Sequence, residues 1–175
     1  MSEQDMLDRE AQEGAPARDP EAAQRALVRV QHLLDKQRRV ESLVHREQSP
    51  AESRKPLVEQ LVHRQHLTEL KVILDRLHPA DIAYILEALP LDDRQVVWDC
   101  VKSDRDGDIL MEVNDAVRET LIASMDHEEL VDAVEGLEAD EIAHLADDLP
   151  ADVVEEIQEG PVSYTHLTLP TTILV

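Results

Sequence analysis

A spacing of twelve residues between similar groups of apolar side chains runs through residues 58–157. The clearest group is Ile82, Ile85, Leu86 and Leu89, whose positions i, i+3, i+4 and i+7 form one face of a helix. Nine such groups follow one another along the chain. The residues that share the position of Leu86 in the central groups are Leu86, Trp98, Leu110, Ile122 and Val134. We expect this column of side chains to be buried together.

The same spacing excludes one continuous helix. Twelve residues advance a helix by three turns plus roughly 120°, so an unbroken helix would turn its apolar face aside at every repeat. Turn-forming residues fall between the groups: His78-Pro79, Pro90, Gly107, Asn114, Asp126, Gly136 and Pro150. The pattern therefore predicts short helices that break near residues 78–80, 90–92, 103–107, 114, 126, 138 and 150. Asp126 and Glu129 also form a capping-box pattern.

Helices this short are unstable alone and must share a core. We therefore expect an all-α protein: a right-handed superhelix of short helices with a twelve-residue repeat, preceded by a longer N-terminal helix. Residues 1–20 are polar and aperiodic, which predicts a disordered tail. Residues 21–48 are expected to form the N-terminal helix, and residues 56–158 the helical-repeat domain. The first two groups, Val58–Val62 and Leu70–Leu77, have no breaker between them, so one helix could run through both.

The net charge of the chain limits the classes of partner that it can bind. The formal net charge is −22, which argues against nucleic acid as a partner, and no stretch is apolar enough to insert directly into a membrane. Residues 119–160 contain fifteen Asp and Glu and no Lys or Arg. This run can be a solvated acidic face, or a surface that binds hard cations such as Mg²⁺ or Ca²⁺. No nucleophile motif or Gly-rich loop is present, so we do not expect an enzyme. The single cysteine, Cys100, suits a core position in a reducing, cytoplasmic compartment.

Three motifs lie within the repeats: His-Pro-Ala-Asp-Ile-Ala-Tyr-Ile-Leu-Glu-Ala-Leu-Pro at residues 78–90, Glu-Val-Asn-Asp-Ala-Val-Arg-Glu-Thr-Leu-Ile at 112–122, and Asp-Glu-Ile-Ala with Asp-Leu-Pro at 140–150. Together they resemble the cytosolic N-terminal domain of the MgtE family of magnesium transporters. The resemblance implies a domain that senses Mg²⁺ and gates a transporter. It implies CBS domains as the partner, a homodimer formed through regions outside this chain, and a place at the cytoplasmic face of the inner membrane.

The resemblance also implies metal ligands. Asp140 is the first candidate and Asp108 the second, with Glu141, Asp147 and Asp148 as further carboxylates, and the implied cofactor is weakly bound regulatory Mg²⁺. An alternative function is a helical-repeat protein-interaction scaffold, because the repeats also resemble those of the flagellar-motor switch. Residues 161–175 lack acids and the repeat, and they resemble translated sequencing-adapter read-through, so the chain is expected to be a fragment.

Overall fold

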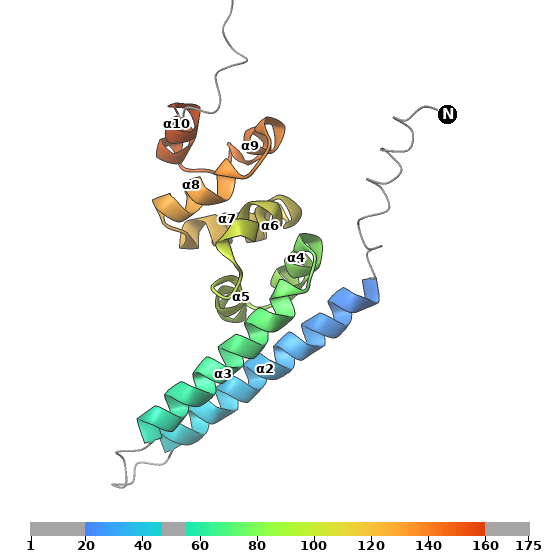
Figure 1. Cartoon of the computed structure of the whole chain (residues 1–175), viewed down its shortest axis with the longest axis vertical. Helices are drawn as coiled ribbons and strands as arrows, with labels where there is room; N and C mark the ends of the chain where they lie inside the picture. Colours follow the sequence, from blue (N-terminus) through green and yellow to red (C-terminus); the bar gives the residue numbers. More distant parts are fainter. Residues whose placement is uncertain (1–19, 47–54, 160–175) are drawn as a thin grey trace, which may run out of the picture.

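The computed structural model describes residues 20–46 and 55–159, and within them all regular structure is helical. The predicted all-α class is thus confirmed. Two long helices, α2 (Pro20–Arg46) and α3 (Lys55–Asp75), form a hairpin beside a stack of shorter helices (Figure 1). The shorter elements are α4 (Pro79–Ala88), α5 (Leu91–Trp98), the 3₁₀ turn η1 (Ser103–Arg105), α6 (Asp106–Glu112), α7 (Asp115–Ser124), α8 (His127–Glu135), α9 (Ala139–Leu145) and α10 (Ala151–Glu159). The predictions for residues 1–19 and 161–175 fall outside the described residues.

The short helices begin where the sequence places capping residues. The Nδ1 atom of His78 accepts from the backbone N–H of Ala80 at the start of α4, just before Pro79 in the first turn. Asn114 caps α7 through its side-chain oxygen. The predicted capping box is confirmed, with reciprocal hydrogen bonds of 2.9 and 2.8 Å between Asp126 and Glu129. Every predicted break between residues 78 and 150 overlaps an interruption between helices, although the break predicted at residues 103–107 begins earlier and ends before α6.

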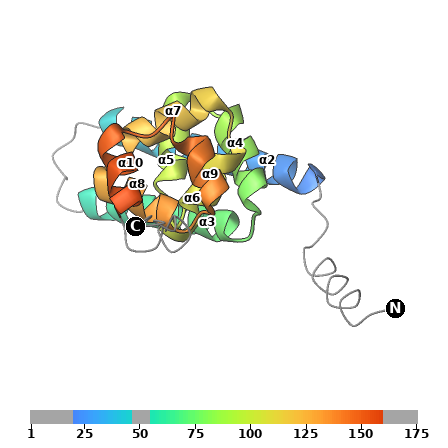
Figure 2. The same ribbon diagram turned by 90° about the horizontal axis from the view of Figure 1, so that it is seen from above.

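Alternate helices of the stack are called columns: α4, α6, α8 and α10 are one column, and α5, α7 and α9 are the other. Helix α4 packs on α6, α6 contacts α8, and α8 packs on α10, so each of these helices meets the one two positions further along the chain. In Figure 2, which looks along the longest axis of the molecule, α8 and α10 overlap. The structural unit is therefore a pair of helices spanning two twelve-residue repeats. The right-handed sense of the superhelix stays a prediction.

The core follows the predicted column of side chains. Leu86, Leu110 and Val134 have no exposed surface, and Trp98 and Ile122 are each 6% exposed. Helices of the two columns thus contribute the same position to one shared core. This arrangement explains how elements of seven to ten residues, too short to be stable alone, remain helical.

Gly107 does not terminate a helix, contrary to the prediction. It is the second residue of α6, and its φ is not positive. A Cβ atom at this position would lie 2.2 Å from the carbonyl oxygen of Ala133 in α8. Gly107 therefore permits the close approach of α6 to α8. The break itself lies earlier, in the turn at residues 99–102 and in η1.

The first apolar group behaves differently from the rest. Val58 and Leu61 are both 57% exposed, whereas Leu70 and Leu74 are buried against α2. Since α3 is continuous, twelve residues rotate its apolar face by roughly 120°, and the first group turns away from the core. Helix α3 thus pairs with α2 along its length instead of forming two units of the stack.

Polar contacts fix the hairpin to the stack. Arg105 of η1 donates to the carbonyl oxygens of Leu74, at 2.9 Å, and Leu77, which terminate α3. Lys102 and Asp75 form an ion pair of 2.9 Å across the same junction. Among the described residues, no helix combines the length and apolar character needed to cross a membrane.

Candidate functional site

Charge is divided sharply between the two parts of the structure. Helices α2 and α3 contain nine Lys and Arg and six Asp and Glu. Residues 79–159 contain four Lys and Arg and 25 Asp and Glu. The stack of short helices therefore carries nearly all of the negative charge of the chain, and its acidic surface is the candidate functional site.

Most carboxylates at the C-terminal end of the stack have no cationic partner. Of the fourteen acidic residues in positions 119–158, only three form ion pairs with other described residues: Asp148 with Arg118, and Asp152 and Glu156 with His127. The remaining acids repel one another at close spacing along α8, α9 and α10, which lowers helix stability. A surface of this kind gains stability when cations approach it.

Three of the five predicted metal ligands are exposed and have no side-chain partner among the described residues. Asp108 lies in the first turn of α6 and Asp140 in the first turn of α9, and both are exposed. Asp147 is exposed in the turn between α9 and α10. None of the three forms an ion pair or a side-chain hydrogen bond with another described residue, so their carboxylate oxygens are free to bind a hard cation.

The other two predicted ligands are already engaged. Glu141 accepts a 2.8 Å hydrogen bond from the backbone N–H of Glu138 and so caps the start of α9. Asp148 lies 3.2 Å from the Nη1 atom of Arg118. Each has one carboxylate oxygen engaged in this way, so both are less available to an ion than the other three predicted ligands.

Within residues 20–46 and 55–159, no three His, Cys, Asp or Glu side chains are grouped so that they could hold a metal ion together. The candidate ligands are therefore spread along the surface. Mg²⁺ commonly retains several waters and takes only one or two carboxylates from a protein, so single exposed Asp residues fit such binding. A complete set of protein ligands would require carboxylates from a second surface.

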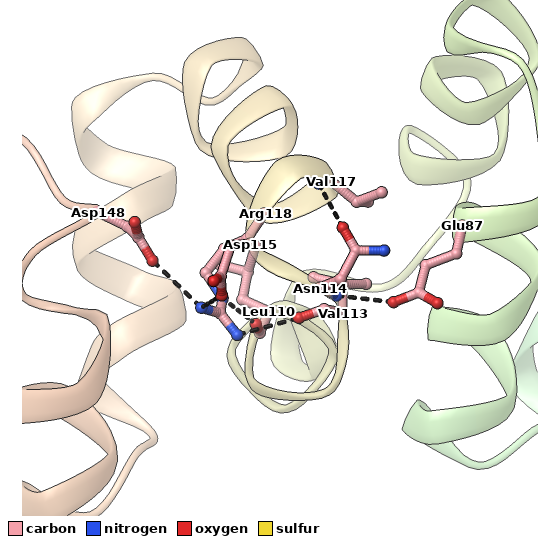
Figure 3. Close-up of polar contacts among 8 residues, drawn as sticks. All are labelled: Glu87, Leu110, Val113, Asn114, Asp115, Val117, Arg118 and Asp148. Atoms are coloured by element: carbon pink, nitrogen blue, oxygen red, sulfur yellow. Dashed lines mark hydrogen bonds and ion pairs between the residues drawn. The ribbon is translucent and has the colours of Figure 1, made fainter.

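Arg118 holds the middle of the acidic stack together (Figure 3). Its side chain is 5% exposed and reaches from α7 to the end of α6, where it donates to the carbonyl oxygens of Leu110 at 2.7 Å and Val113 at 3.0 Å. The Nη1 atom of the same guanidinium contacts Asp115 of α7 at 3.0 Å and Asp148 of the α9–α10 turn at 3.2 Å. Arg118 thus caps one helix, forms ion pairs with two carboxylates and joins α7 to the α9–α10 turn.

The sequence analysis missed this role, although a signal for it exists. Arg94 lies 24 residues before Arg118 and donates to the carbonyl oxygens of Leu86 and Leu89, at the same offsets of eight and five residues. The 24-residue recurrence of arginine would have revealed both the cap and the two-helix unit. A pattern of apolar residues alone could not, because both columns of helices share the same apolar spacing.

Two titrating groups accompany the acidic surface. Burial, followed by the neighbouring carboxylates of Glu129 and Asp104, raises the pKa of Asp106 to about 7. The His127 ring lies between the carboxylates of Asp152, at 2.9 Å, and Glu156, at 2.6 Å. The hydrogen bond with Glu156, followed by that with Asp152, raises the pKa of His127. Protonated His127 therefore links the start of α8 to α10.

Comparison with known proteins identifies this part of the chain. Residues 77–160 match the sequence model of the family described as the MgtE intracellular N domain. No curated protein matches the chain. The match begins at the end of α3 and covers the acidic stack from α4 to α10, which also contains the three motifs that resemble this family. The chain thus contains an MgtE intracellular N domain, formed by residues 77–160.

Proposed function

We propose that the acidic stack is the magnesium-sensing, regulatory domain of a magnesium transporter. In this proposal it lies at the cytoplasmic face of the inner membrane and docks on CBS domains of the full-length transporter. The observation that supports it most is the set of exposed carboxylates without a described partner, Asp108, Asp140 and Asp147, on a stack that matches the MgtE intracellular N domain. Two acidic surfaces repel each other until cations neutralise them, so docking would depend on the concentration of a divalent ion.

The donor atoms fit such weak, shared sites. Asp108, Asp140 and Asp147 would supply single carboxylates to a partly hydrated Mg²⁺ ion. Arg118 would meanwhile keep Asp148 neutralised within the stack. The surface of this chain would then provide half of each site and the docked partner the other half. Weak affinity in the isolated chain follows from this division.

Thermal unfolding of the chain in MgCl₂ and in NaCl at matched ionic strength tests the proposal. At a free concentration near the Kd, binding to the folded state contributes only about 0.4 kcal/mol, since the gain is RT ln 2. For a chain of this size that corresponds to a rise in Tm of about 1–2 °C beyond the effect of NaCl. The double substitution Asp108→Asn with Asp140→Asn should reduce this difference.

A matched control separates ligand loss from a simple change in charge. Asp92 and Glu128 are also exposed acids in first helical turns. The double substitution Asp92→Asn with Glu128→Gln removes an equal number of negative charges at these other positions. This control should leave the difference between the two salts unchanged. If MgCl₂ and NaCl act identically on the unsubstituted chain, or if both double variants behave alike, the proposed ligands are wrong.

A further inference from the structure

The hairpin of α2 and α3 has a surface that differs from the acidic surface of the stack. Helices α2 and α3 border a groove of about 1200 Å³ that runs beside Ala22–Leu33 of α2 and Thr68–Leu77 of α3. The half-buried side chains of Leu33 and Ile73 line it. Val28 and Val72, which also line it, are 61% and 49% exposed. The groove is therefore apolar and open to solvent.

The arginines Arg29 and Arg76 line this groove, together with one acid, Glu69. Neither Arg29 nor Arg76 forms an ion pair or a side-chain hydrogen bond with another described residue. By contrast, all four Lys and Arg of residues 79–159 are engaged, either with carboxylates or with helix carbonyls. Arg29 and Arg76 therefore give this groove positive charge beside exposed valines, in a chain whose net charge is −22.

We propose that this groove binds an acidic amphipathic helix of a partner protein. The partner's apolar residues at i, i+3 or i+4 and i+7 would cover Val28, Val72 and the floor of the groove. Its carboxylates would meet Arg29 and Arg76, and charge complementarity of this kind sets orientation and rate of association. The α2 wall extends from Ala22 to Leu33, or roughly 17 Å, so a helix of about three turns fits it.

The charge of the rest of the chain favours a discrete helix over an anionic membrane. The 25 acidic residues of the stack belong to the same molecule and would be repelled by an extended anionic surface. A single helix contacts the hairpin alone and avoids this repulsion. The groove is independent of the Mg²⁺ proposal, because it lies on the hairpin and uses none of the candidate ligands.

Fluorescence anisotropy with the full chain provides the test. The probe is a side-chain-stapled helical peptide of about twelve residues with Leu at i, i+3, i+7 and i+10 and Glu on its flanks. A second peptide has Lys in place of every Glu. We expect the Glu peptide to bind with an affinity that falls as salt rises, and the Lys peptide to bind at least about tenfold more weakly.

Two double variants with the same change in charge locate the binding surface. Arg29→Glu with Arg76→Glu reverses the cations of the groove and should weaken the Glu peptide at least about tenfold. Arg39→Glu with Arg64→Glu reverses two exposed cations elsewhere on the hairpin and should weaken it less than about threefold. Circular dichroism verifies that both variants are folded.

Several results would overturn the proposal. They are equal binding of the two peptides, equal loss of affinity in the two double variants, and absence of binding by the Glu peptide at millimolar concentration. Binding to phosphatidylglycerol vesicles that only the groove variant abolishes would assign the groove to a membrane instead. Concentration-dependent sedimentation that only the groove variant abolishes would assign it to a second copy of the chain.

Discussion

Replacing Gly107 by Ala should destabilise the stack, although alanine is the better helix former. The added Cβ would lie 2.2 Å from the carbonyl oxygen of Ala133 and 3.2 Å from two side-chain atoms of Leu137. The leucine side chain can rotate, but the carbonyl belongs to the backbone of α8, so α6 and α8 must separate. Overpacking of this severity costs about 3 kcal/mol, and the gain in helix propensity offsets about 1 kcal/mol. We expect a net loss of about 2 kcal/mol.

Gly136→Ala provides the matched control. This glycine caps the end of α8 with a φ of −80°, and a Cβ there would meet nothing within 4 Å. The substitution should leave stability unchanged or raise it by up to about 1 kcal/mol, because it reduces the freedom of the unfolded chain.

Urea unfolding measures both variants. Trp98 is the only tryptophan, is 6% exposed and lies in the stack, so its fluorescence reports the folding of this region. Far-UV circular dichroism follows the helices as a whole. If Gly107→Ala proves as stable as Gly136→Ala, α6 and α8 are not as close as described, and the explanation for Gly107 is wrong.

Three further predictions concern the polar contacts of the stack. Arg118→Met should lower the free energy of unfolding in urea by about 1–3 kcal/mol because it leaves the carbonyls of Leu110 and Val113 unpaired. Asp115→Asn should cost less than about 1 kcal/mol because that partner is 93% exposed, and equal costs would contradict this role for the carbonyls. Because the pKa of His127 is raised in the folded state, protonated His127 stabilises the chain fully below pH 6.5, and this stabilisation is lost as the pH rises through the folded-state pKa. His127→Gln should therefore destabilise the chain more at pH 5.5 than at pH 8.5. The pKa of Asp106 is about 7 in the folded state and 3.8 in the unfolded state, so the stability of the chain falls as the pH rises between these values. Asp106→Asn should therefore stabilise the chain at pH 8 and have little effect near pH 3.5. Urea unfolding at both pH values tests this.

Sequence periodicity predicted the stack well because each short helix obeys a local rule. His78, Asn114 and Asp126 cap helices through contacts within three residues, and the apolar spacing within each helix defines its buried face. Such short-range features can be read directly from the order of residues. The breaks between helices and the burial of the central column followed from them.

Contacts between helices could not be derived in the same way. The role of Gly107 depends on the position of Ala133, which lies 26 residues away, and no local pattern relates the two. The exposure of Val58 depends on α3 remaining continuous, which pairing with α2 favours. At the candidate site, the sequence identified the excess of carboxylates, but only the structure shows that Asp148 is neutralised by Arg118.

The alternation of two helix columns limits how chains with this architecture can change length. Deleting residues 103–114, which is one repeat, would remove α6 and make α7 follow α5 directly. Helix α7 would then occupy the position of α6, which belongs to the other column. Deleting residues 91–114, two repeats, would join α4 to α7 and keep the alternation. Arg118 would then follow Leu86 and Leu89 by eight and five residues, the offsets that Arg94 has now. Insertions and deletions of 24 residues therefore preserve the apolar spacing, the alternation of helices and the spacing of the arginine caps, whereas those of twelve preserve the apolar spacing alone.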